Sequence, residues 1–199
     1  AYFTSPINDQ WAWGVAIFTT YGVGGDYPTV FPAGDISGYT SLASVNLNPS
    51  IAYKANDHLS LGAGVNLVYA HAELNRYYGA LGGLFGTDAD EQLIGLEGTT
   101  YSFGWNIGAL YEVNDQHRFG VGYRSAVDLD FDDGDFYDGT GDIAPNGATG
   151  RLQIELPAIL ELSGFHQFSE LFALHYSWQR TDWSVFKELK ATSEDCVEG

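Results

Sequence analysis

A sustained alternation of apolar with small or polar residues is the feature that most limits how this chain can fold. From Leu59 onward the odd positions are leucine, alanine, valine or tyrosine, while the even positions are mainly serine, glycine and asparagine. A period of two gives a β-strand one apolar face and one small or polar face. Eight such runs are expected, at residues 1–7, 11–26, 40–55, 59–78, 100–113, 117–135, 150–168 and 171–189.

The length of these runs separates two kinds of β protein. Strands of soluble sheets usually have about 5–6 residues, and most of these runs are far longer. Membrane strands need about 9–11 residues to cross a bilayer, with extensions beyond it. Aromatic residues also recur at both ends of the expected membrane band, as in the girdles of outer-membrane barrels. Those near the turns are Trp11, Trp13, Tyr53, Tyr111 and Phe172, and those further along the strands are Tyr21, Tyr69 and Tyr101.

Four short turn signals divide the chain at intervals of 48, 58 and 55 residues, and each interval holds two long strands and one long loop. They are Asn8-Asp9, Asn56-Asp57, Asn114-Asp115 and Ser169-Glu170. Short turns on one side and long loops on the other are typical of bacterial outer-membrane barrels. The predicted fold is therefore all-β: a partial transmembrane antiparallel β-barrel with short periplasmic turns and long outer loops. Residues 1–199 are expected to form a single domain.

The amino-acid composition excludes several kinds of partner and site. A net charge of −18 argues against nucleic acid, because phosphates need a basic partner. The single cysteine, Cys196, excludes a disulfide within the chain. The acidic run Asp128–Asp142 fails the EF-hand pattern, since Asp133 stands where glycine is required. A solvated loop facing divalent-bridged lipopolysaccharide is the favoured interpretation of that run.

Several ordered segments then resemble one known family. They are SPINDQWAWG at 5–14, VNLNPSIAY at 45–53, FGWNIGALY at 103–111 and RFGVGYRS at 118–125. Together they resemble the FadL family of outer-membrane long-chain fatty acid transporters, over essentially the whole chain. The resemblance implies a cofactor-free, monomeric, multi-pass barrel in the bacterial outer membrane. It also implies a larger barrel, with the N-terminal hatch and the closing strands absent here, whereas a self-contained barrel of the eight runs is the alternative.

Arg76 is the first candidate for contact with a ligand. It falls on the even, inward face near the outer end of its run, provided that no bulge intervenes. A guanidinium binds a carboxylate through two parallel hydrogen bonds, and the family segment that resembles residues 73–79 carries a ligand-contacting arginine. An arginine paired with an acidic side chain inside the barrel is the other interpretation. The fatty acid tail is expected to contact Phe18, Val68 and Leu74.

An apolar outer loop at residues 79–98 is the second candidate. Short helices with an apolar groove are expected there, and exposed apolar patches often mark ligand sites. The resemblance implies capture of hydrophobic substrate at such a loop, through Leu81, Leu84 and Phe85. Packing of the loop onto itself is equally compatible with the sequence.

Glycines interrupt the run at residues 11–26, and glycine within a strand marks a bend or bulge. The resemblance implies a kinked strand that releases substrate sideways into the membrane, and Tyr21 and Gly22 are the residues that match it. A frayed strand end before Pro28 is the alternative.

Other functional classes fit less well. No serine lies in a recognisable nucleophile elbow near His71 or His175, so no enzyme, catalytic residue or metal site is predicted. A general diffusion porin and a purely structural or adhesive barrel stay open. The pattern is compatible with long-chain fatty acids and with aromatic hydrocarbons as substrates.

Overall fold

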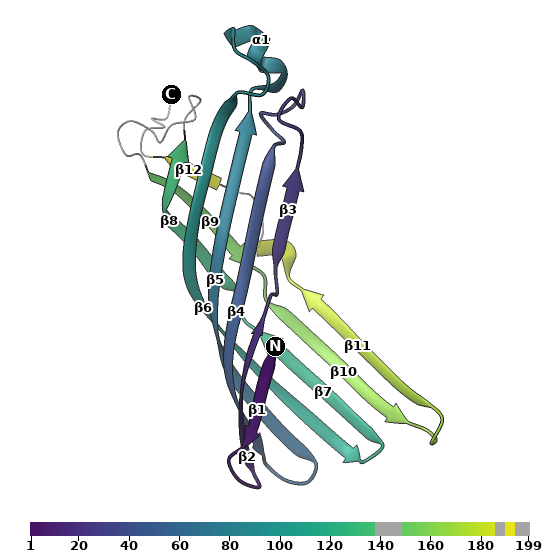
Figure 1. Ribbon diagram of the computed structural model, residues 1–199. Helices are drawn as coiled ribbons and strands as arrows, with labels where there is room; N and C mark the ends of the chain where they lie inside the picture. Colours follow the sequence, from purple (N-terminus) through teal and green to yellow (C-terminus); the bar gives the residue numbers. More distant parts are fainter. Residues whose placement is uncertain (138–148, 186–189, 194–199) are drawn as a thin grey trace.

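The computed structural model describes residues 1–137, 149–185 and 190–193 (Figure 1). Within them the chain forms one sheet of twelve strands and a few short helical turns. The strands are β1 (Tyr2–Pro6), β2 (Trp11–Phe18), β3 (Gly22–Asp26), β4 (Tyr39–Lys54), β5 (Leu59–Tyr77), β6 (Gln92–Asn114), β7 (His117–Arg124), β8 (Val127–Tyr137), β9 (Thr149–Leu156), β10 (Ile159–Gln167), β11 (Ala173–Thr181) and β12 (Lys190–Ser193). The helical elements are η1 (Gly79–Leu81), α1 (Gly82–Phe85) and η2 (Trp183–Val185).

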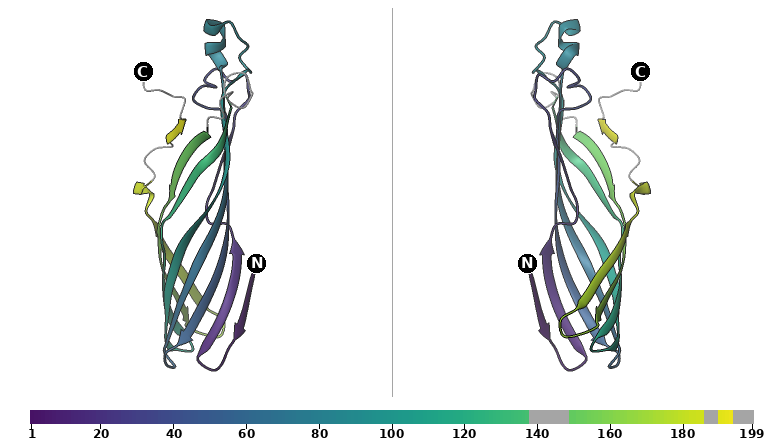
Figure 2. Two further views of the ribbon diagram at one scale, coloured as in Figure 1. Left: turned by 90° about the vertical axis from the view of Figure 1, so that its left-hand side faces the viewer. Right: turned by 90° about the vertical axis from the view of Figure 1, so that its right-hand side faces the viewer.

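The main wall of the sheet is antiparallel throughout and follows the order β1-β2-β4-β5-β6-β7-β10-β11. In the described part of the chain, β1 and β11 are its two edges, so the wall is a curved part of a barrel (Figure 2). Across the described residues, no helix has the length and hydropathy to cross a membrane. The strand order and its antiparallel pairing confirm the all-β antiparallel prediction.

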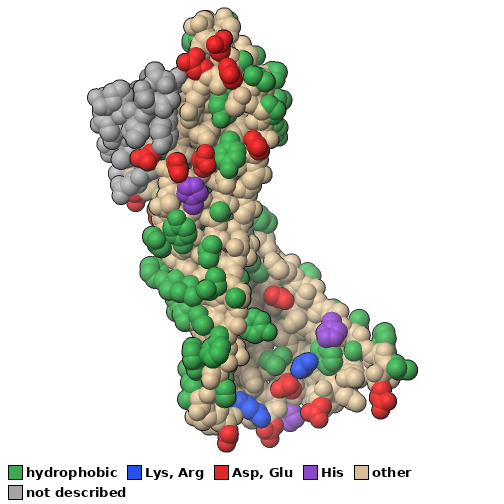
Figure 3. Space-filling view, in the orientation of Figure 1, with side chains coloured by type: hydrophobic (Ala, Val, Ile, Leu, Met, Phe, Trp, Pro, Cys, Tyr) green, Lys and Arg blue, Asp and Glu red, His purple; other side chains and the backbone are tan. Residues whose placement is uncertain are grey.

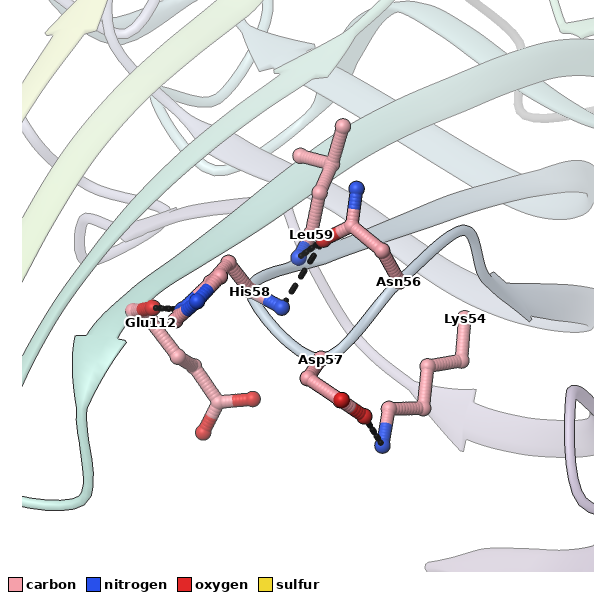
Figure 4. A network of polar contacts seen from close by, with 6 residues as sticks. All are labelled: Lys54, Asn56, Asp57, His58, Leu59 and Glu112. Carbon is pink, nitrogen blue, oxygen red and sulfur yellow. Dashed lines mark hydrogen bonds and ion pairs between the residues drawn. The ribbon is translucent and has the colours of Figure 1, made fainter.

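The same side-chain hydrogen bonding closes all four predicted turns. These turns lie together at one end of the wall, which we call the turn end. The side-chain oxygen of the first turn residue accepts hydrogen bonds from the backbone N–H groups two and three residues later. Asn56 Oδ1 accepts from His58 at 2.8 Å and from Leu59 at 2.9 Å (Figure 4). Asn8, Asn114 and Ser169 make the equivalent pairs of bonds. This is the local hydrogen bonding that favours Asn and Ser in turns.

The two faces of the wall are inverted relative to a soluble protein. On β4 and β5 the even residues are buried although several are polar, as are Ser44, Asn46 and Asn66. The neighbouring odd residues are apolar and exposed, with Val65 at 49% and Leu67 at 37%. An apolar outer surface is stable only in contact with lipid, so the alternation predicted from the sequence forms a membrane-facing wall.

Three of the eight predicted runs are divided into two strands and a fourth is shortened, which the alternation did not indicate. Residues 11–26 form β2 and β3, 117–135 fall in β7 and β8, and 150–168 form β9 and β10. In the described part of the run 171–189, β11 is the only strand, and η2 follows it. In the other direction, β6 begins at Gln92, well before the expected residue 100. Leu93, Ile94 and Leu96, assigned to the outer loop from sequence, belong to this strand.

An apolar core lies at the opposite end, the loop end, between two leaves of the sheet. The β8–β9 hairpin contributes Leu129, Phe131 and Ile154, and β4–β6 contribute inward residues such as Val68 and Leu96. If the alternation continued unbroken, Val127, Leu129, Leu152, Ile154 and Leu156 would lie on the same outward face as the apolar residues of β7 and β10. The breaks at Ser125–Ala126 and Pro157–Ala158 change the face, so these side chains point inward and are buried.

Candidate functional site

The wall is interrupted between β2 and β3. Phe18 pairs with Asn46 and Gly22 pairs with Ala43, so three residues on one strand face only two on β4. One extra residue is a β-bulge, which bends the strand and changes which face each side chain occupies. Tyr21 lies inside this interruption and Gly22 is the first residue of β3. The predicted break in the strand is therefore present.

Gly22 is not itself the cause of the bend. Its φ is not positive, and a Cβ there would lie at an ordinary 3.6 Å from the carbonyl oxygen of Leu42. The extra residue, and contacts made across the inner face, shape the interruption instead.

Two residues far away in the sequence hold the segment Thr19–Tyr21 from inside. The Tyr21 hydroxyl donates to the carbonyl oxygen of Pro157 at 2.6 Å. Arg124 Nη1 donates to Thr20 Oγ1 at 3.1 Å, and the guanidinium carbon lies 4.8 Å from the centre of the Phe18 ring. Arg124 is the last residue of β7 and Pro157 follows β9. The residues on both sides of the β8–β9 pair therefore contact the interruption between β2 and β3.

These contacts border a cavity of about 920 Å³ on the concave inner face. Its lining includes Phe18, Tyr21, Leu42, Arg124, Ile159 and Glu161. The space-filling view shows a hollow beside the tall part of the wall, with charged side chains around it (Figure 3). The volume lies within the range of about 300–1,000 Å³ that is usual for small-molecule sites.

A belt of asparagines crosses the inner face, and two of them, Asn48 and Asn106, line the same cavity. Asn48 Nδ2 donates to Asn106 Oδ1 at 2.6 Å and to Asn66 Oδ1 at 3.0 Å, which joins β4, β5 and β6. The Nδ2 groups of Asn46 and Asn66 are buried and have no hydrogen-bond partner among the described residues. The inner face thus keeps polar groups where a soluble sheet would bury apolar ones.

Arg76 lies on the inward face as predicted, since the β5–β6 register is regular through Arg76 and shifts only after it. The side chain is partly buried at the loop end. Its Nη1 donates to the carbonyl oxygens of Asn75 at 2.9 Å and Tyr39 at 3.1 Å, and to Thr40 Oγ1 at 3.2 Å. Among the described residues no carboxylate forms an ion pair with it.

The structure separates the other predicted ligand residues into three places. Phe18 lines the cavity. Val68 is 1% exposed inside the apolar core, and Leu74 packs against that core. Leu81, Leu84 and Phe85 lie in η1 and α1 at the tip of the loop end, where the expected short helices do form, and Leu84 and Phe85 are 80% and 71% exposed.

Arg124 and the asparagine belt were not singled out from the sequence. Each lies at an even, inward position, and the arginine lies in the middle of the predicted run 117–135. Their contacts join residues 104 and 58 positions apart in the chain, so only the folded sheet reveals them. An inward arginine among glycines was the one available signal.

The part of the acidic run from Asp128 to Asp135 falls in β8, as the predicted strand run 117–135 requires, so the solvated-loop interpretation does not hold for it, and Asp128 and Asp130 are exposed on this strand. Within the described part of the chain, no three potential metal ligands gather. Asp138, Asp142 and Cys196 lie outside the described residues.

Comparison with known proteins matches this architecture. A family model described as outer membrane protein transport protein (OMPP1/FadL/TodX) matches residues 1–198. A long-chain fatty acid transport protein of Escherichia coli O6:H1 is 38% identical over 97% of this chain and 50% of its own length. Outer membrane protein P1 of Haemophilus influenzae is 35% identical over 98% of this chain and 47% of its own length. The chain thus spans about half the length of these curated relatives.

Solved structures share the fold. A crystal structure of a Pseudomonas aeruginosa FadL homologue superposes with a TM-score of 0.80 at 22% identity, covering 97% of this chain and 50% of that one. The Ralstonia pickettii toluene transporter TbuX superposes with a TM-score of 0.65 at 20% identity, covering 92% and 55%.

Proposed function

The chain belongs to the OMPP1/FadL/TodX family of bacterial outer membrane transport proteins, and on that basis we propose that it forms about half of a channel for long-chain fatty acids or related hydrophobic molecules. The observation that carries the proposal is an inward arginine without an acidic partner among the described residues, next to an apolar, exposed loop tip. A carboxylate with a long apolar tail is the ligand that matches both features.

Capture begins at the loop tip. Leu84 and Phe85 expose large apolar side chains to the outside, and burying them against an alkyl chain gains roughly 25 cal/mol per Å² of apolar surface. Arg76 then binds the carboxylate in place of its present neutral acceptors, because bonds between ionised partners are roughly twice as strong as neutral ones.

Passage continues over the inner face toward the interruption between β2 and β3. Phe18 and Tyr21 line this route, and the alkyl tail packs against them. Val68 and Leu74 belong to the core beneath the β8–β9 hairpin, so the tail reaches them only when that hairpin moves away. Release is sideways at Tyr21 and Gly22, where the wall is bulged and its hydrogen bonding to β4 is locally broken.

The substrate class follows from the relatives by analogy. One relative is named for long-chain fatty acids and one structural neighbour for toluene. The unpaired arginine favours the acid over the hydrocarbon, because a neutral aromatic ligand would leave the guanidinium without an ionic partner. The proposed channel is a monomeric barrel surrounded by lipid and lipopolysaccharide, and neither a cofactor nor catalysis is part of it.

Binding of palmitate to the full-length protein in detergent tests this proposal. Arg76→Gln should weaken palmitate binding roughly ten- to hundredfold, because a hydrogen bond to a charged group contributes about 1.5–3 kcal/mol. Binding of methyl palmitate, which has no charge, should be unchanged. Equal palmitate affinity of the two proteins would remove the carboxylate role of Arg76.

A general diffusion porin is the second candidate, because the inner face carries the polar residues Ser44, Asn46 and Asn48. Liposome swelling in glucose separates the two functions. Rapid swelling would favour an open aqueous pore, whereas a hydrophobic channel leaves the liposomes unchanged.

A further inference from the structure

We infer that Arg124 is a second binding site for the carboxylate of the transported amphiphile, located at the interruption of the wall. The inference rests on the proposed function and adds a residue to it that the sequence pattern did not single out. Arg124 ends β7, and its side chain crosses the inner face to the segment Thr19–Tyr21. It is thus the cation beside the proposed exit.

The present partners of Arg124 do not satisfy its charge. Nη1 donates to the neutral hydroxyl of Thr20, and the guanidinium lies over the ring of Phe18. Its Nε is buried without a hydrogen-bond acceptor in the described part of the chain. No described carboxylate lies within ion-pair distance, although Glu161 lies close enough to act on it electrostatically. A partly buried cation of this kind is stabilised by an anion that reaches it.

The cavity around Arg124 provides for both ends of an amphiphile. Phe18, Leu42 and Ile159 line it together with the arginine, so a carboxylate at the guanidinium places an alkyl tail against apolar side chains. The hydroxyl of Thr20 is an exchangeable acceptor, because a carboxylate offers a charge-assisted, bidentate bond instead. Binding therefore frees Thr20 from Arg124 at the place where the wall is already bulged.

Arg76 and Arg124 are two separate carboxylate-binding sites, or stations, on the inner face of the wall. In the register of β6, Arg76 is opposite Ile94 and Arg124 is opposite Asn106. Those twelve positions correspond to about 40 Å of strand at about 3.3 Å per residue. One carboxylate cannot contact both arginines, so a ligand passes from the first to the second.

A purely structural function of Arg124 makes a different prediction about Thr20. If the arginine only ties the Thr19–Tyr21 segment in place, removal of either partner should have the same effect. If it binds the ligand, loss of the Thr20 hydroxyl removes a competitor and leaves palmitate affinity equal or higher. Thr20→Val is therefore the variant that separates the two functions.

The experiment measures equilibrium binding of palmitate and methyl palmitate to the full-length protein in detergent. An Arg76→Gln background isolates the second station, and the unaltered protein is measured in parallel. In that background, Arg124→Gln should weaken palmitate binding at least tenfold and change methyl palmitate binding by no more than about twofold. Thr20→Val should weaken the binding of neither ligand. Arg118→Gln is the matched control, because Arg118 precedes Arg124 on the inward face of β7 and also lies over a ring, 4.5 Å from the centre of Phe165.

Three results overturn the inference. Arg124→Gln could leave palmitate affinity unchanged, Arg118→Gln could weaken it as much, or Thr20→Val could reproduce the loss. Heat-modifiable migration in SDS gels verifies that every variant is folded. Absence of saturable palmitate binding in the unaltered protein is a separate outcome, since it would contradict the proposed function itself.

Discussion

Val65 and Val113 allow a direct test of which face of the wall meets lipid. Both are valines on the outward face, with similar exposures of 49% and 45%. Val65 lies six residues beyond the start of β5 at Leu59, whereas Val113 is next to the last residue of β6 at the turn end. At a rise of about 3.3 Å and a tilt of about 45°, six residues reach about 14 Å, near the middle of an apolar band about 25 Å tall.

The different depths of Val65 and Val113 in the bilayer determine how much an introduced charge should lower the free energy of unfolding. Val65→Arg should lower the free energy of unfolding by about 2–4 kcal/mol, and Val113→Arg by about 0–1 kcal/mol, because an arginine near the interface reaches water. Urea-induced unfolding of the full-length protein in phospholipid bilayers, monitored by tryptophan fluorescence, gives both values. Equal losses for the two variants would refute the assignment of this face to lipid, since a water-exposed surface has no such depth dependence.

Two further predictions concern stability and titration. Phe131 is 1% exposed in the core between the two leaves, so Phe131→Ala should cost about 3–5 kcal/mol in the same unfolding assay, and a loss below 1 kcal/mol would contradict the buried position. At the turn end, the hydrogen bond and then the charge of Lys54 lower the pKa of Asp57. Because this pKa is lower in the folded state, the stability it contributes is present above the ordinary carboxyl pKa and is lost as pH falls through the lowered value. Lys54→Met should return the pKa of Asp57 toward its ordinary range in an NMR titration, and an unchanged pKa would exclude the pairing.

Local patterns were sufficient to predict the wall and its turns. The alternation around Val65 and Asn66 assigns one residue to lipid and the next to the inside, since neighbouring side chains of a strand point to opposite faces. Asn56 identifies its turn because the bonds it accepts come from residues two and three positions later. Both features depend on residues that are close together in the sequence.

The breaks in the strands depend on distant contacts and were mostly missed. The alternation continues through Arg124, Val127 and Leu129, yet two residues between β7 and β8 change the face. The bulge at Thr19–Tyr21 is held by Arg124 and Pro157, more than a hundred residues away. Periodicity detects a strand but not a single inserted residue, and a bulge of one residue changes the face of everything beyond it.

The alternation predicted the facing of some candidate residues, while their function stays a prediction. Arg76 and Phe18 do face inward, because the register of their strands is regular up to those residues. Val68 also faces inward, but the β8–β9 hairpin that covers it could not be anticipated from the strand pattern alone. Arg124 was likewise not predicted as a site residue, because its contact with Thr20 depends on the folded sheet and not on the strand pattern.

Growth on a fatty acid tests the central claim most directly. The full-length protein would be expressed in a bacterial strain that lacks its own outer-membrane fatty acid transporter, with oleate as the sole carbon source. Transport of long-chain fatty acids predicts restored growth, and reduced growth when Arg76 and Arg124 are both replaced by glutamine. Failure to grow, with the folded protein present in the outer membrane, would contradict the account.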